Sequence, residues 1–409
     1  MLKDQALKLF RQLNRKKTAQ VISPLAVFPL AACGGAGSDK ADDSTSTGGN
    51  QTSSSASTNS LYSSGDFVNV SIGSNTQLFD RTLETYGIKL VISGDVGSQK
   101  AVPNEWAYKT AQTIKLMLNP DAEGINKVAQ ENVVRTLKGE DGTWHEGMPT
   151  LQRVMKGGGD DYSPNPLKDW GAYGGDIDTL FNTHMDNDMV WYQNSSHGAV
   201  TTEGDIDIQE LMEHLMHTIH LYGVRGGVEG STAALKGTEE TDINYETSEL
   251  WLAMQEAISN GVYDISGYGD APAHFVITKE YTYLLNFNMW EFGSEFWPDG
   301  GYLAPEWADS ARTVEGIQAN NPLGYALFQK YFDPVLSKPD AGTLRNMFQD
   351  NDSGLSGYVP DSASSSSYIA PSSSYQNQVI RSDNVEEVSL NDVMFTEMGI
   401  IDGPSSIIV

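Results

Sequence analysis

The clearest helical periodicity in the chain belongs to Asp205-Ile-Asp-Ile-Gln-Glu210-Leu-Met-Glu213-His214-Leu-Met-His217-Thr-Ile-His220-Leu-Tyr-Gly223. At about 100° per residue, this segment forms two different faces. One face collects apolar side chains: Leu211, Met212, Leu215, Met216, Ile219 and Tyr222. The opposite face collects two carboxylates and three imidazoles: Glu210, Glu213, His214, His217 and His220. The pattern therefore predicts an amphipathic helix whose second face is rich in possible metal ligands.

Three of the seven histidines of the chain lie on this second face. Imidazole and carboxylate groups are typical ligands of Zn²⁺, and residues four apart on a helix can reach one ion together. Glu213 and His217 have that spacing, and His220 follows one turn later. Two interpretations stay open at this point, a zinc site and a polar face that is solvated or structural.

The run Glu213-His214-Leu-Met-His217 resembles the active-site motif of the zincin metallopeptidases, His-Glu-x-x-His. In that motif two histidines hold zinc and the glutamate is the general base. The first two residues are exchanged in this chain. The resemblance therefore implies Glu213 and His217 as ligands, with His214 as the base or as a further ligand. It implies peptide-bond hydrolysis, with a non-catalytic surface lipoprotein, such as a degenerate zincin that binds a partner, as the alternative.

In the glutamate-type zincins a third ligand comes from a glutamate on a later helix. The segment Thr278-Lys-Glu280-Tyr281-Thr-Tyr283 offers such a residue about 60 positions downstream. The resemblance implies Glu280 as the ligand and Tyr281 or Tyr283 as a hydrogen-bond donor to an oxyanion. The other interpretation of Glu280 is a first-turn residue that the helix dipole favours.

The segments around this helix predict an α+β fold. Residues 88–93 are β-branched and apolar, which indicates a strand, and residues 103–118 follow as an amphipathic helix. Residues 126–137 and 248–260 indicate further helices, whereas residues 139–205 are rich in Gly, Asp, Asn and Pro and predict mostly loop. We expect one large, loop-rich domain that is mainly helical after an N-terminal strand. The resemblance implies that this domain is zincin-like.

Residues 1–33 have the features of an export signal. A basic stretch precedes the mostly apolar residues 21–32, and this run is too short to span a bilayer and contains Pro24 and Pro29. Leu-Ala-Ala-Cys33 resembles the bacterial lipobox, which implies lipidation of Cys33, the only cysteine of the chain. We expect an exported lipoprotein held at the periplasmic side or cell surface, with the outer membrane favoured. An ordinary cleaved signal peptide and an uncleaved tail are the alternatives.

Composition divides the rest of the chain into three parts. Residues 34–64 are Gly, Ser, Thr, Asp and Asn, which is typical of a flexible tether. Residues 65–360 form the predicted globular domain, and residues 361–409 form a Ser-rich tail.

The net charge of −28 argues against nucleic acid as a partner, because phosphate backbones are repelled. A peptide or protein substrate and a lipid anchor are the partners that we expect.

Two acidic segments are candidates for calcium, a less favoured metal than zinc. These are Asp186-Asn-Asp188 with His184, and residues 350–354. Both are carboxylate-rich and turn-like, but neither has the twelve-residue EF-hand pattern. A calcium-stabilised binding module therefore stays open as a form of the non-catalytic alternative.

Overall fold

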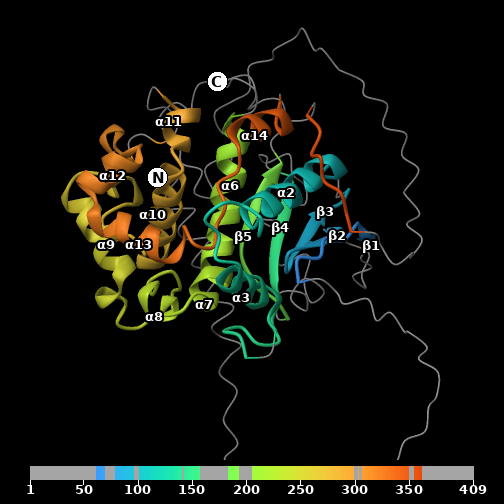
Figure 1. Cartoon of the computed structure of the whole chain (residues 1–409), viewed down its shortest axis with the longest axis horizontal. Coiled ribbons are helices and arrows are strands. Elements are labelled where there is room, and N and C mark those ends of the chain that lie inside the picture. Colours follow the sequence, from blue (N-terminus) through green and yellow to red (C-terminus); the bar gives the residue numbers. More distant parts are fainter. Residues whose placement is uncertain are drawn as a thin grey trace, which may run out of the picture.

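The computed structural model describes residues 61–69, 79–95, 101–140, 142–156, 183–192, 205–298, 303, 306–349 and 354–361. Within them the fold is α+β, as predicted, with a five-stranded mixed sheet in the N-terminal part and a mainly helical part after it (Figure 1). The export segment with Cys33, nearly all of the tether and the tail after residue 361 lie outside the described residues. The domain boundaries stay predictions.

The sheet has the strand order β1-β2-β3-β4-β5, so neighbours in sequence are neighbours in space. Its strands are β1 (Val68–Asn69), β2 (Phe79–Thr85), β3 (Ile88–Ser93), β4 (Thr150–Lys156) and β5 (Met185–Tyr192). The first three strands pair antiparallel, and β3, β4 and β5 pair parallel. The predicted strand over residues 88–93 is confirmed as β3, in the centre of the sheet.

The prediction that residues 139–205 are mostly loop is wrong for β4 and β5, and the domain has more strands than the single one expected. These strands were not predicted because polar side chains interrupt the apolar pattern by which a strand is recognised in sequence. Gln152 of β4 is fully buried and accepts a hydrogen bond from Thr218 Oγ1 (2.5 Å). Arg153 of β4 is paired with Asp186 of β5, with Nε and Oδ1 2.9 Å apart. Pairing between buried polar groups replaces the apolar alternation that a strand ordinarily shows.

The three helices predicted outside the Glu/His segment are confirmed. They are α2 (Asn104–Met117), α3 (Lys127–Lys138) and α9 (Glu249–Ser259). The Asn126 side chain caps α3 by accepting from Ala129 N, and Ser248 caps α9 by accepting from Trp251 N. These local signals explain why the sequence located the helix starts within a residue or two.

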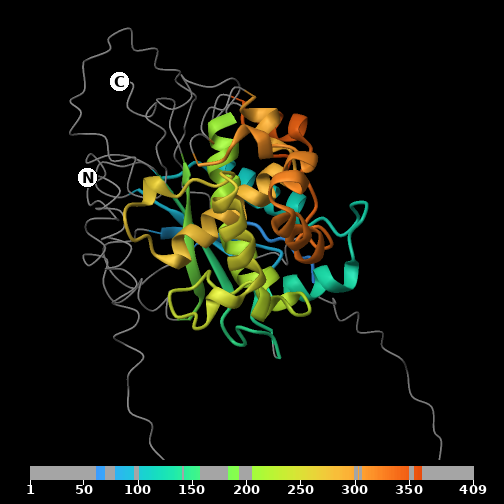
Figure 2. The ribbon, with the colours of Figure 1, turned by 90° about the vertical axis from the view of Figure 1, so that its left-hand side faces the viewer.

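The Glu/His segment forms α6 (Asp205–Ile219), which continues as a π-helical turn, η2 (His220–Val224). α6 lies between β5 and α10 (His274–Met289) and contacts both, so it joins the sheet to the helical part (Figures 1 and 2). The remaining helices are short: α7 (Arg225–Gly227), α8 (Ser231–Ala234), η3 (Tyr245–Thr247), η4 (Ser266–Tyr268), α11 (Phe292–Phe296), η6 (Asp309–Ala311), α12 (Val314–Asn320), α13 (Pro322–Tyr331) and α14 (Ala341–Met347).

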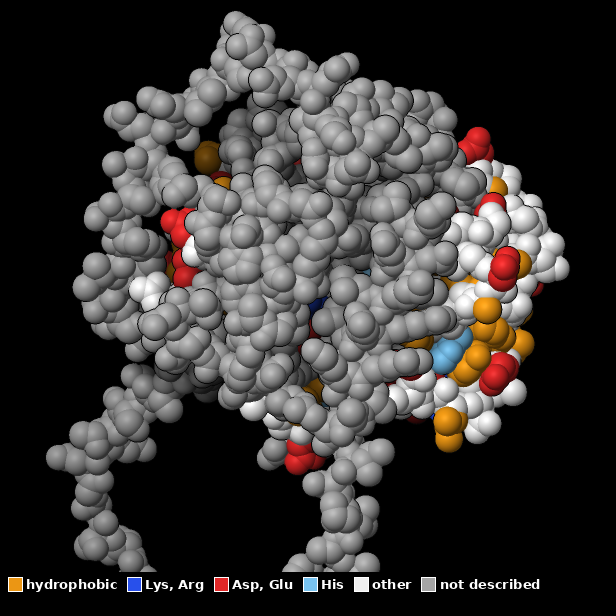
Figure 3. All heavy atoms as spheres, turned by 180° about the vertical axis from the view of Figure 1, so that it is seen from behind, with side chains coloured by type: hydrophobic (Ala, Val, Ile, Leu, Met, Phe, Trp, Pro, Cys, Tyr) orange, Lys and Arg blue, Asp and Glu red, His pale blue; other side chains and the backbone are white. Residues whose placement is uncertain are grey.

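The surface of the described part carries separate acidic side chains, as Figure 3 shows on the side opposite to Figure 1. Among the described residues, no helix combines the length and the apolar composition that crossing a membrane requires. The hydrophobic core runs from the sheet through α6 into the helical part without interruption. A side chain on α6 is therefore placed by packing from both directions.

Candidate metal centre

Both faces of α6 are buried. The apolar face is at most 4% exposed at each of Leu211, Met212, Leu215, Met216, Ile219 and Tyr222. On the polar face Glu213, His214 and His217 expose only 5%, 1% and 3% of their surface. The interpretation of this stripe as a solvated face is therefore wrong. Burying two imidazoles and a carboxylate side by side is costly unless they are paired or hold a metal ion.

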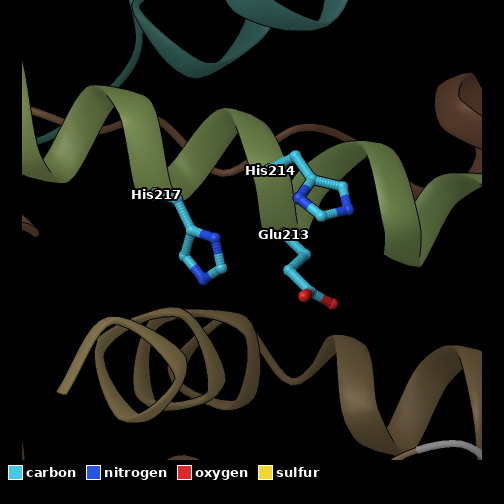
Figure 4. A group of neighbouring side chains, drawn as sticks. All are labelled: Glu213, His214 and His217. Carbon is cyan, nitrogen blue, oxygen red and sulfur yellow. The ribbon is translucent and has the colours of Figure 1, made fainter. Parts of the chain in front are cut away.

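Glu213, His214 and His217 form one cluster in which a ligand atom of each residue lies within 4.8 Å of the others. Glu213 and His217 are one helical turn apart and project to the same side of α6, and the His214 ring stands next to them (Figure 4). The two imidazole rings are 6.0 Å apart between centroids and nearly perpendicular, at 81°. The predicted convergence of Glu213 and His217 is confirmed, with His214 as a third member.

The ends of α6 are fixed by polar contacts to other elements. Arg345 of α14 donates to both carboxylate oxygens of Asp205, the first residue of α6, at 3.1 Å each. Near the other end, Thr218 is bonded to Gln152 in the sheet. These contacts fix the position of α6 along its axis and its rotation about that axis. They therefore set the direction in which its polar stripe faces.

Glu280 approaches this cluster from α10. Its Oε2 lies 3.7 Å from His217 Nε2, and its side chain is 13% exposed. α10 begins at His274, which makes Glu280 the seventh residue of the helix. The interpretation of Glu280 as a first-turn residue is therefore wrong, since the dipole effect fades after the first turn.

Glu210 extends the cluster toward the start of α6. Its Oε2 lies 3.7 Å from His214 Nε2, and both residues are buried. Glu210 and His214 are four residues apart, the same spacing as Glu213 and His217. The sequence placed Glu210 on the stripe without assigning it a role, and this repeated spacing was the signal that could have found it.

Tyr283 lies across from His217, with ring centroids 5.9 Å apart and an interplanar angle of 89°. Burial raises the pKa of the Tyr283 hydroxyl well above its usual value, and the nearby carboxylates Glu213, Glu210 and Glu280 raise it further. The phenol therefore stays protonated at any physiological pH and can act as a hydrogen-bond donor.

His220 shares the stripe but contacts a different part of α10. Its Nε2 is hydrogen-bonded to Asn286 Oδ1 at 3.0 Å, and its ring packs on Phe332 with centroids 4.7 Å apart. Burial lowers the pKa of His220 to about 3; the hydrogen bond that its ring donates to Asn286 opposes this shift, and the neighbouring His217 adds to it. His220 is thus held as a neutral ring beside the cluster, where it does not join Glu213, His214 and His217. No helical pattern in the sequence indicated Asn286 as its partner.

The two segments predicted as calcium sites do not belong to this cluster. Asp186 and Asp188 lie on β5 rather than in a turn, and Asp186 is bound to Arg153, so the expected calcium-binding turn is absent at that segment. His184 Nε2 lies 3.1 Å from Lys89 Nζ. Most of the second candidate, residues 350–353, lies outside the described residues.

The donor set of the cluster fits a metal ion. Neutral imidazole nitrogen and carboxylate oxygen are the ligands of zinc and of other first-row divalent ions. Comparisons with models of protein families, with curated proteins and with solved structures found no match for this chain. The argument for function therefore depends on the residues of the site.

Proposed function

We propose that this chain is an exported zinc-binding protein whose metal centre hydrolyses peptide bonds. The observation that carries the proposal is the buried cluster of Glu213, His214 and His217 on one helix, with Glu280 facing it from another. Zinc is one of the metals that a mixed set of imidazole and carboxylate donors binds. Polar groups of this kind are expensive to bury together unless they are paired or hold an ion.

The residues around the centre have separate tasks in this proposal. Glu213, His214 and His217 hold the ion, and Glu280 supplies a further oxygen donor from α10. Bound zinc provides a Lewis acid and an activated water. Tyr283, protonated and close to His217, donates a hydrogen bond to the carbonyl oxygen of the peptide as negative charge builds on it. His214 is proposed as a ligand rather than as a base, because its ligand atom lies among those of Glu213 and His217.

A second candidate function is a non-catalytic zinc protein, and the burial of the cluster favours it. With every member of the cluster at most 5% exposed, the ion would be enclosed as structural zinc sites are. In that case zinc links α6 to α10 and stabilises the fold, and the protein acts through its surface.

Elemental mass spectrometry tests the shared part of both candidates. The chain, purified without a His tag and dialysed against metal-free buffer, should retain zinc, and a folded His217→Ala variant should retain less. Equal zinc in the two proteins would rule out the site. Hydrolysis of casein or mixed peptides then decides between the candidates: cleavage that is lost in His217→Ala supports the peptidase, and bound zinc without cleavage supports the structural role.

We also propose that the protein is anchored at the membrane through a lipid on Cys33. The support is the lipobox-like run Leu-Ala-Ala-Cys33 after a basic and apolar segment. Expression in a bacterial host with a radiolabelled fatty acid should label the wild-type chain. The Cys33→Ser variant should stay unlabelled, and label in both proteins would contradict the anchor.

A further inference from the structure

The metal centre contains more buried donors than one tetrahedral ion uses. Glu210 is 4% exposed, and among the described residues its Oε2 has no hydrogen-bond partner, while His214 Nε2 lies 3.7 Å away. A buried carboxylate oxygen without a hydrogen bond is costly, and its position beside an imidazole nitrogen indicates a cation between or next to them. Counting Glu210, the cluster offers five donors: Glu210, Glu213, His214, His217 and Glu280.

The distances divide these donors into two pairs. Zinc ligands lie about 2.0–2.2 Å from the ion, so two donors of one ion cannot be more than about 4.4 Å apart. The pairs Glu210–His214 and His217–Glu280 are each separated by 3.7 Å and fit this limit. Each pair is therefore close enough to share one ion. The ligand atoms of Glu213, His214 and His217 lie within 4.8 Å of one another, so Glu213 is near both pairs.

The three carboxylates of the site lie around one buried residue. Glu210, Glu213 and Glu280 all raise the pKa of the Tyr283 hydroxyl. Three carboxylates and two imidazoles are more ligands than a single tetrahedral ion uses.

We propose that the centre holds two zinc ions, one bound by His217 and Glu280 and the other by Glu210 and His214, with the Glu213 carboxylate bridging them. The inference rests on the proposed zinc function and adds a second metal site to it. Bridged two-metal centres have ions about 3.5–4 Å apart, and aminopeptidases are among the enzymes that use them. The second ion would place Glu210 among the ligands and give His214 a metal of its own.

Zinc stoichiometry tests this inference directly. The chain is loaded with zinc in the presence of excess calcium, which occupies surface carboxylates, and zinc per chain is measured by native mass spectrometry. We expect two zinc ions in the wild type, one in Glu210→Gln, and two in Glu315→Gln, which removes an exposed carboxylate of α12. Circular dichroism establishes that each variant is folded.

The outcomes separate this inference from the proposed function. One zinc in the wild type and one in Glu210→Gln would overturn the second ion and leave the single zinc site standing. Two zinc ions in both proteins would place the second ion elsewhere and also overturn the inference. No zinc in the folded wild type would overturn both proposals. If Glu210→Gln does not fold, the wild-type count alone decides, with one ion contradicting the inference.

Discussion

Glu280 on α10 faces His217 on α6, with carboxylate oxygen and imidazole nitrogen 3.7 Å apart. The two residues lie 63 positions apart in the sequence and on helices with other elements between them. This contact connects the polar stripe of α6 to the helical part of the fold. It also makes the candidate metal centre depend on the packing of α6 against α10.

Replacing Glu280 with Gln should weaken zinc binding at least about 10-fold, because a proposed anionic oxygen ligand becomes a neutral amide while the size of the side chain is kept. Competition with a chromophoric chelator measures the dissociation constant. Glu249→Gln, an exposed carboxylate on α9 that pairs with Lys330, is the control and should leave the affinity unchanged. Equal affinities in Glu280→Gln and the wild type would exclude Glu280 from the centre.

Removing zinc should lower the stability of the fold. An ion that binds only the folded chain stabilises it by about 2.7 kcal/mol when its free concentration is a hundred times the dissociation constant. We expect a chelator to lower the midpoint of thermal unfolding in the wild type and to have a smaller effect on His217→Ala. Differential scanning calorimetry at fixed protein concentration makes the measurement. An identical shift in the two proteins would show that the chelator acts elsewhere.

The buried pair of Arg153 and Asp186 should stabilise the parallel edge of the sheet. Its side chains are 8% and 5% exposed, so removing one partner leaves a charge in the interior. Arg153→Met should lower the free energy of unfolding by about 3–5 kcal/mol, measured by urea denaturation. The double variant Arg153→Met with Asp186→Asn should recover part of that loss. A single variant as stable as the wild type would contradict the role of this pair.

Acid should destabilise the protein in part through His145. Burial, followed by the charge of Arg225, lowers the pKa of His145 to about 4 from an unfolded value near 6.5. Between these values the unfolded chain binds the proton and the folded chain does not. Stability is therefore full above pH 6.5 and falls as the pH drops toward 4.

Replacing His145 with Gln removes this contribution, so the variant's free energy of unfolding should change less steeply over the same range. Urea titrations at several pH values between 4 and 7 compare the two proteins. His220, whose pKa is lowered in the same direction, is present in both and contributes equally. Parallel curves for the wild type and His145→Gln would contradict the prediction.

The sequence alone determined the local structure of four helices and one strand. The helices α2, α3, α6 and α9 follow from apolar periodicity, from side-chain caps such as Asn126 and Ser248, and from glycines that end them. The α+β class follows from the strand β3. The convergence of Glu213 and His217 also follows, because a four-residue spacing on a helix sets their distance whatever the helix packs against.

Only the tertiary structure decided what the polar stripe of α6 is. Its burial depends on two other elements, β5 and α10, that pack against it, and periodicity describes a face without saying what covers it. Packing places Glu280 beside His217 and His220 beside Asn286. It also buries Gln152 and the ion pair of Arg153 and Asp186 in strands that the sequence pattern had predicted as loop. The spacing of side chains along a helix depends only on residues that are neighbours in sequence. Contacts between helices and strands depend on how the whole chain packs around its core.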